Sequence, residues 1–211
     1  MHMAPALALV LGYTEVRGAH YGPFGRSRMK SVTSGGREIF RCHIDLFDAE
    51  HDRFPYPDAH FDCVLACEIL EHLRHDPMHM LVESRRILAD GGALVLTTPN
   101  CASLASLTRV LHGCENPQIF SCYPHPLRAA QDAPHVREYT PYELRRTLAA
   151  GGFRVETLFT GRINGHEEGT WAYELLRRNG FDTELRGEQI YCVARKDPAL
   201  PVDRYPRALY E

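Results

Sequence analysis

The sequence predicts an α/β fold in which a mostly parallel sheet carries helices on both faces. Stretches with the composition of strands alternate with stretches of helical periodicity along most of the chain. Two of the strands, at 61–67 and 93–98, are largely apolar, which is typical of parallel strands buried on both faces. The chain has 211 residues, of which 44% are apolar and 24% charged, so it can bury a substantial core.

The first part of the chain is expected to contribute one helix and three strands. The helix-prone segment is "PALALVLGY", and strands are expected at 15–22, 37–47 and 61–67. The last of these, "FDCVLAC", is the clearest because its apolar run is nearly continuous. Two acidic residues and a histidine follow it directly, at Glu68, Glu71 and His72.

A helix between the two apolar strands would supply the crossover that parallel strands require. Asp76 and Pro77 provide an N-cap and a first-turn proline, and apolar residues follow at helical spacing. We expect "DGG" at 90–92 to end this helix, and the strand "ALVLTT" to follow at 93–98.

The second half of the chain continues the alternation. Thr140, Pro141 and Glu143 form a capping box with proline at the first helical position, and the helix is expected to end at Gly151 and Gly152. The other expected elements are a short helix in 102–113, strands at 153–160 and 187–196, and a helix at 168–180. We therefore expect one domain over 1–196, with a loop or lid insertion at 101–139, and a C-terminal tail at 197–211.

Composition and charge narrow the class of protein. The net charge of -3 does not favour a dominant nucleic-acid-binding surface, which needs a basic excess. The longest apolar run, at 6–11, is far shorter than the roughly 20 residues that span a bilayer, and no signal peptide is recognised. The cysteines number seven, an odd count, and none forms a CxxC pair, so we expect free thiols and a cytoplasmic protein.

Polar residues stand where the expected strands end. These ends are His20-Tyr21, Asp45-Leu46, Glu68 and Pro99-Asn100. In folds with parallel sheets, ligands bind outside the carboxyl ends of the strands. This arrangement suits a ligand with an adenosine-like part, whose hydroxyls and amine need a few fixed partners.

Residues 48–100, "DAEHDRFPYPDAHFDCVLACEILEHL…DP…LVESRRILADGGALVLTTPN", resemble the core of class I S-adenosylmethionine-dependent methyltransferases. The segment "HVREYTPYELRRTLAAGGFRVETL" at 135–158 is similar to the family segment that follows. The resemblance covers about 45–195 and implies a Rossmann-like methyltransferase fold with an antiparallel last strand. It implies S-adenosylmethionine as the cofactor.

Individual cofactor contacts are carried over by position from this resemblance. Asp45 corresponds to the acid that contacts the adenine amine, and Leu46 to the residue that packs on the ring. Glu68 and Cys67 would line the methionine side of the pocket, and His20 would donate to a ribose hydroxyl. A helix cap or turn residue is the simpler alternative for Asp45.

The "ExxEH" pattern suggests a divalent metal site. Glu71 and His72 follow Glu68 by three and four residues, so a helical turn would bring the three side chains to one side. With His135, the set Glu68, Glu71, His72 and His135 resembles the metal site of small-RNA 2′-O-methyltransferases, and "ExxEH" alone that of ubiquinone-biosynthesis O-methyltransferases. Mg²⁺ or another divalent cation would relieve the repulsion between crowded carboxylates. Alternatively, Glu71 and His72 only anchor the helix.

One family feature is missing from the sequence. Members begin with a strand that ends in a turn of the type "DxGxGxG", which cradles the methionine carboxylate, and this sequence contains no GxGxG. Three interpretations stay open: an N-terminally truncated methyltransferase, a rebuilt but working enzyme, or a cofactor-free domain acting as a binding or scaffold subunit.

The resemblance implies transfer of a methyl group to a substrate oxygen. We expect O-methylation of a small molecule or sugar hydroxyl, with RNA 3′ ends and quinone precursors as the next candidates. The hydroxyl must lose its proton, either through a cation or through a general base, for which His135 and His72 are the candidates.

Overall fold

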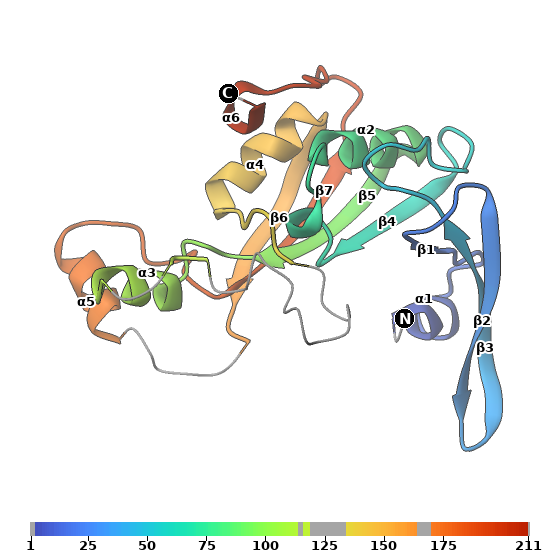
Figure 1. The fold of residues 1–211 in the computed structure, drawn as a ribbon, viewed down its shortest axis with the longest axis horizontal. Coiled ribbons are helices and arrows are strands. Elements are labelled where there is room, and N and C mark those ends of the chain that lie inside the picture. The colour runs from blue at the N-terminus through green and yellow to red at the C-terminus, as the bar shows by residue number, and fades with distance from the viewer. Residues whose placement is uncertain (1–2, 114–115, 119–133, 164–169, 211) are drawn as a thin grey trace. The chain divides into compact units, whose positions relative to one another are not determined.

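The computed structural model describes residues 3–113, 116–118, 134–163 and 170–210. Its contacts divide the chain into two compact units, Met1–Pro57 and Asp58–Glu211 (Figure 1). Each unit is therefore described by itself. The division falls between Pro57 and Asp58, within the domain that was expected to run over 1–196, and the single domain stays a prediction.

The first unit is a small three-stranded sheet with one helix. Its elements are α1 (Met3–Leu9), β1 (Gly18–His20), β2 (Arg26–Ser34) and β3 (Arg37–Leu46), and the strand order is β1-β3-β2. β1 runs parallel to β3, whereas β2 runs antiparallel to it. Gly35 and Gly36 join β2 to β3 with positive φ angles of 55° and 77°, which is the backbone that a two-residue hairpin turn of the right twist requires.

The second unit contains a four-stranded mixed sheet. Its strands are β4 (Phe61–Cys67), β5 (Leu88–Pro99), β6 (Phe153–Gly161) and β7 (Gln189–Lys196), in the order β4-β5-β7-β6. β4 and β5 are parallel, and β7 is antiparallel to both of its neighbours. The antiparallel last strand is confirmed. Parallel pairing among the described strands is limited to β1–β3 and β4–β5, because β2 and β7 each run against their neighbours.

Two helices pack on this sheet and complete its core. α2 (Pro77–Ile87) begins at the Asp76 cap, and α4 (Pro141–Ala150) begins at the expected capping box. They are neighbours, since Arg85 of α2 donates to the Gly152 carbonyl just beyond α4. The core side chains are fully buried: Leu81, Leu94, Leu96, Leu144, Leu148 and Ile190.

The end of α2 differs from the expectation. The helix ends at Ile87 and β5 already begins at Leu88, so "DGG" lies within the strand and does not end the helix. The pairing of β4 with β5 jumps from Phe61–Leu88 to Cys63–Ala93. Gly91, with φ of 73°, lets the chain make this irregularity, because such a backbone is strained for other residues.

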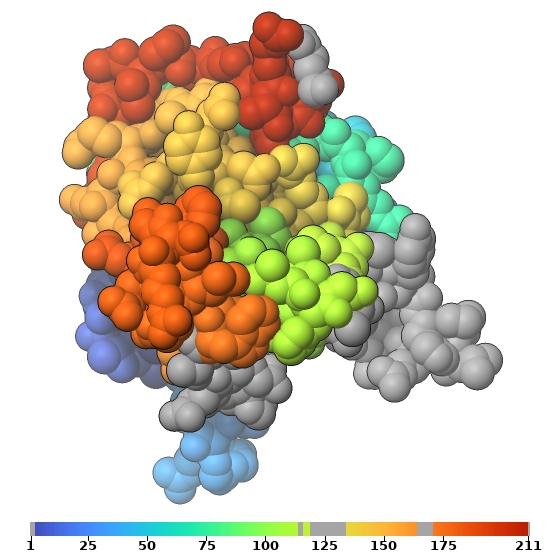
Figure 2. Space-filling model, turned by 90° about the vertical axis from the view of Figure 1, so that its left-hand side faces the viewer, coloured from blue at the N-terminus to red at the C-terminus, as the bar shows by residue number. Residues whose placement is uncertain are grey.

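The remaining described elements of the second unit are short. They are a 3₁₀ turn, η1 (Leu70–His72), and the helices α3 (Leu104–Leu111), α5 (Thr170–Arg178) and α6 (Arg207–Tyr210). α3 and α5 lie side by side (Figure 2), with the His112 and Trp171 rings stacked at 5.2 Å. Residues 114–115 and 119–133 of the expected loop or lid insertion at 101–139 lie outside the described residues. No described helix has the length and apolar character needed to cross a membrane.

The C-terminal segment folds against the second unit. The Asp203 amide donates to the Ala150 carbonyl at 2.8 Å. Arg204 binds the Asp76 carboxylate with two nitrogens, and the Tyr210 hydroxyl donates to the same carboxylate at 2.6 Å. The expected tail is thus a packed segment that ties the start of α2 to the end of α4.

Candidate functional site

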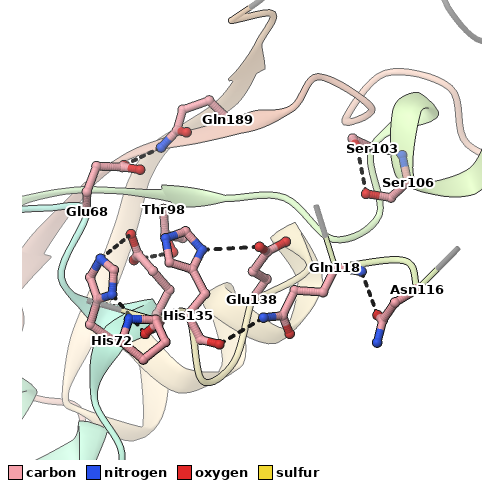
Figure 3. Close-up of polar contacts among 12 residues, drawn as sticks. Glu68, His72, Thr98, Ser103, Ser106, Asn116, Gln118, His135, Glu138 and Gln189 are labelled. Carbon is pink, nitrogen blue, oxygen red and sulfur yellow. Dashed lines mark hydrogen bonds and ion pairs between the residues drawn. The ribbon is translucent and has the colours of Figure 1, made fainter. Parts of the chain in front are cut away.

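Glu68 stands at the carboxyl end of β4 in a strained conformation. Its φ angle is 54°, in the left-handed region that L-residues rarely adopt. The exposed carboxylate accepts hydrogen bonds from Thr97 Oγ1, at 2.6 Å, and from Gln189 Nε2. Two neighbouring strands, β5 and β7, therefore hold this carboxylate in a fixed position at the sheet edge (Figure 3).

Glu71 lies in η1 and is completely buried, with 0% exposure. Its Oε2 accepts a hydrogen bond from Thr98 Oγ1 at 2.8 Å. Its Oε1 has no hydrogen-bond partner within the described part of the chain. Burial raises the pKa of Glu71 to about 7, against smaller lowering effects of its hydrogen bonds. A buried carboxyl with an unsatisfied oxygen is costly, and such groups require an explanation.

Two histidine rings complete the environment of Glu71. His72 Nε2 lies 3.8 Å from Glu71 Oε1, and the rings of His72 and His135 meet edge to face at 4.6 Å. His72 Nδ1 donates to the Pro134 carbonyl at 3.1 Å, and His135 Nδ1 donates to Glu138 Oε1 at 3.2 Å. Because a neutral imidazole carries one proton, these bonds leave a lone pair on Nε2 of each ring.

Glu71, His72 and His135 thus form a possible metal site, which we call the EHH cluster. One ligand atom from each residue lies within 4.8 Å of the other two. Glu68 was expected in the same set, but its carboxylate is bound to Thr97 and Gln189 and does not belong to this cluster of described residues. Its role as a fourth ligand stays a prediction.

The backbone fixes the two halves of the EHH cluster to each other. The amides of Val136 and Arg137 donate to the Glu71 carbonyl at 2.7 and 3.3 Å. Gln118 Nε2 donates to the His135 carbonyl at 2.9 Å. The two amide bonds join segments that lie far apart in the sequence, so the backbone of the folded chain holds the cluster together.

The cofactor residues expected in the first unit lie at the carboxyl ends of β1 and β3. His20 pairs with Leu46, and Ala19 with Asp45, on these parallel strands. The Asp45 carboxylate accepts a hydrogen bond from the Tyr56 hydroxyl at 3.0 Å and lies 3.8 Å from Arg17 Nε. Cys67 belongs to the second unit, where burial raises the pKa of its thiol. The cofactor contacts of these residues stay predictions.

Four contributors to the site were not singled out from the sequence. Thr97, Thr98 and Gln189 hold the two carboxylates, and Glu138 holds His135. The threonines belong to the "TTPN" motif that supports the resemblance, and Glu138 follows His135 by three residues. The motif and this spacing could have pointed to the threonines and to Glu138. No local feature of the sequence points to Gln189, because its role depends on the pairing of β7 with β5.

The sheet, its crossover helix and the polar cluster at the strand ends define an α/β protein of Rossmann-like fold. Residues 16–96 match the family model described as "Methyltransferase domain". The match contains β4, the turn with Glu71 and most of β5, and it ends before the TTPN motif and the segment at 135–158. Over these residues the chain is similar to the methyltransferase domain family.

Known proteins with similarity to the chain match only part of it. Uncharacterized proteins of Mycobacterium tuberculosis H37Rv and Mycobacterium bovis are 33% identical over 119 residues, which is 54% of this chain and 35% of each relative. The chain therefore spans about a third of the length of these curated relatives.

Among solved structures, a methyltransferase of Archaeoglobus fulgidus is 20% identical with a TM-score of 0.46, over 72% of this chain and 67% of that one. A methyltransferase of Thermotoga maritima is 18% identical with a TM-score of 0.48, over 74% and 65% of the two chains.

Proposed function

We propose that this chain is part of an S-adenosylmethionine-dependent enzyme that O-methylates a small-molecule or sugar hydroxyl, and that the EHH cluster binds a divalent cation. The observation that supports the cation most strongly is the environment of the carboxylate oxygen Glu71 Oε1. This buried oxygen has no hydrogen-bond partner in the described part of the chain, and it lies beside an imidazole nitrogen that carries a lone pair. A cation would satisfy both atoms at once.

The donor set fits such an ion. Imidazole nitrogen and carboxylate oxygen are ordinary ligands of divalent metals. Around a tetrahedral ion with bonds of roughly 2.0–2.2 Å, two ligand atoms are about 3.4 Å apart. The 3.8 Å between Glu71 Oε1 and His72 Nε2 is close to that value. When bound, the ion would lower the pKa of an acceptor hydroxyl and so favour the alkoxide.

In the second unit, Glu68 would contact the cofactor, because it offers an exposed carboxylate of fixed position, which suits hydroxyl or ammonium groups. In the first unit, taken by itself, His20, Asp45 and Leu46 offer an imidazole, a carboxylate and an apolar contact on adjacent strands. The cofactor supplies a methyl group on sulfonium, which passes to the acceptor oxygen by in-line displacement, so alignment contributes most of the rate. The sequence offers no glycine-rich turn for the cofactor carboxylate.

The side chains of the EHH cluster are suited to removing the proton of the acceptor hydroxyl. Thr98 holds Glu71 in place, and the Pro134 carbonyl holds His72 with its lone pair on Nε2. The same geometry would let His72 or His135 act as a general base in the absence of a cation. Divalent-cation dependence separates the two possibilities, because a base mechanism tolerates a chelator.

The test is binding of S-adenosylhomocysteine by calorimetry, followed by methyl transfer to a panel of hydroxylated small molecules with and without EDTA. We expect micromolar-range binding, and activity that EDTA removes and a divalent cation restores. Glu71→Ala and His135→Ala should each abolish the cation dependence, whereas Glu156→Gln, on the exposed side of β6, should not. Full activity of the wild type in EDTA would exclude the cation.

A second candidate function is a binding or scaffold subunit without cofactor. The absence of GxGxG from the sequence favours it, because that turn cradles the methionine carboxylate in the family. This function predicts that the chain binds no S-adenosylhomocysteine at millimolar concentration. The same calorimetric titration therefore decides between the two candidates.

A further inference from the structure

Beyond the three residues of the EHH cluster lies a second buried carboxylate, Glu138, whose side chain has 0% exposure. It accepts a hydrogen bond from His135 Nδ1 at 3.2 Å (Figure 3). Burying a carboxylate is costly unless it is hydrogen-bonded to a group that benefits from its charge. The imidazole of His135 is such a group. A cation bound to its Nε2 would make the Nδ1 proton more acidic, and the negative charge of Glu138 would then stabilise the imidazole through a stronger hydrogen bond.

We propose that Glu138 is the positioning residue of the EHH cluster, and that the cluster is selective for a late divalent transition metal over Mg²⁺ and Ca²⁺. This inference deepens the proposed function and rests on its cation site. Carboxylate–histidine–metal arrangements fix the tautomer and the ring orientation of a ligating histidine and raise its basicity. Glu138 fixes the tautomer and ring orientation of His135, and the Pro134 carbonyl fixes those of His72.

The metal preference follows from the fixed rings. With both Nδ1 atoms engaged as donors, the cluster presents two imidazole nitrogens and a single carboxylate oxygen. Mg²⁺ and Ca²⁺ prefer sites built from oxygen, whereas Zn²⁺ and its neighbours bind imidazole strongly. Hydrogen bonds of the polypeptide support this geometry, since the Val136 amide and Gln118 fix the backbone around His135.

The experiment measures metal binding and not catalysis. The full-length, metal-stripped protein is titrated with Co²⁺, followed by visible absorption, and with Zn²⁺ in competition with a chromophoric chelator. We expect one tight site that millimolar Mg²⁺ or Ca²⁺ does not displace. Glu138→Ala should weaken Zn²⁺ binding 10–100-fold, the range for loss of a partner that orients a ligand. Glu138→Gln should weaken it less, because an amide oxygen still accepts the Nδ1 proton.

Four variants are needed to interpret the titrations. His135→Ala should lose more affinity than Glu138→Ala, and Glu156→Gln should lose none. Metal binding that persists unchanged in His135→Ala comes from elsewhere in the chain, such as the cysteines, and overturns the proposal. Unchanged affinity in Glu138→Ala, with a native circular dichroism spectrum, overturns the positioning role. If Glu138→Ala does not fold, Glu138→Gln carries the test. Its neutral amide does not raise the basicity of His135 as a carboxylate does, so it should bind Zn²⁺ more weakly than the wild type, and an affinity and Co²⁺ spectrum equal to the wild type would contradict the role.

The inference and the proposed function fail separately. Calorimetry with S-adenosylhomocysteine is run on the same protein preparation. Metal binding as described, without binding of S-adenosylhomocysteine, overturns the methyltransferase proposal and leaves Glu138 as the positioning residue of a metal site. Binding of S-adenosylhomocysteine without a Zn²⁺ or Co²⁺ site overturns this inference alone.

Discussion

Glu71→Gln should stabilise the metal-free protein relative to the wild type as the pH rises. Burial raises the pKa of Glu71 from 4.5 to about 7. Below pH 4.5 the carboxyl is protonated in both the folded and the unfolded chain. Between pH 4.5 and 7 only the unfolded chain is ionised, so the free energy of unfolding falls as the pH rises. At 1.36 kcal/mol per pH unit, the total loss is about 3 kcal/mol.

The glutamine variant removes this dependence. Its amide has nearly the same shape, its oxygen can still accept from Thr98, and it stays neutral at every pH. The assay is urea unfolding in EDTA at pH 4.5 and pH 8, for the wild type, Glu71→Gln and the exposed control Glu156→Gln. The difference between Glu71→Gln and the wild type should shift by about 3 kcal/mol in favour of the variant between the two pH values.

The reasoning would be refuted if the difference in the free energy of unfolding between Glu71→Gln and the wild type is the same at pH 4.5 and pH 8. It would mean that Glu71 is stabilised as a carboxylate in the folded protein, by a partner that the geometry does not explain. The buried oxygen would then give no reason to expect a cation. Addition of Zn²⁺ at pH 8 provides a further check, because it should raise the stability of the wild type and not that of Glu71→Gln.

Two further predictions concern the framework around the site. Burial alone would raise the pKa of Asp76, but hydrogen bonds from Arg204, Tyr210 and a backbone amide outweigh burial and lower the pKa from 3.8 to about 2. Asp76→Asn should therefore lower the free energy of unfolding by about 2.5 kcal/mol at pH 7, measured by urea unfolding. This loss should fade as the pH falls from 3.8 to 2. Thr140→Ala should destabilise the protein by about 1 kcal/mol, because it removes the side-chain cap of α4. Thr140→Ser should keep the cap and the stability. Equal thermal unfolding of the two variants would contradict the capping role.

The sequence predicted best the elements whose signals are local. The strand at 61–67 has the predicted bounds because its apolar run ends sharply at Cys67. The helix from Pro141 begins where the capping box places it. In contrast, β2 was not predicted, because "RSRMKSVTS" is polar and lacks the alternation of a half-buried strand. The Gly35-Gly36 turn was the only local sign of that hairpin.

The site was predicted in part. Helical spacing placed Glu68, Glu71 and His72 on one side, but the strained backbone at Glu68 turns its carboxylate toward Thr97 and Gln189. The distant His135 does meet Glu71 and His72. That meeting depends on a backbone contact between segments far apart in the chain, and periodicity cannot predict such contacts. The resemblance to a known family supplied this part of the prediction.

The most direct test of the cation site is a crystal of the protein grown with Zn²⁺, measured at the zinc absorption edge. The account predicts one strong anomalous peak within about 2.0–2.2 Å of Glu71 Oε1 and of Nε2 of His72 and His135. An anomalous map without a peak at these three atoms, at a zinc concentration that saturates other sites in the crystal, would contradict it.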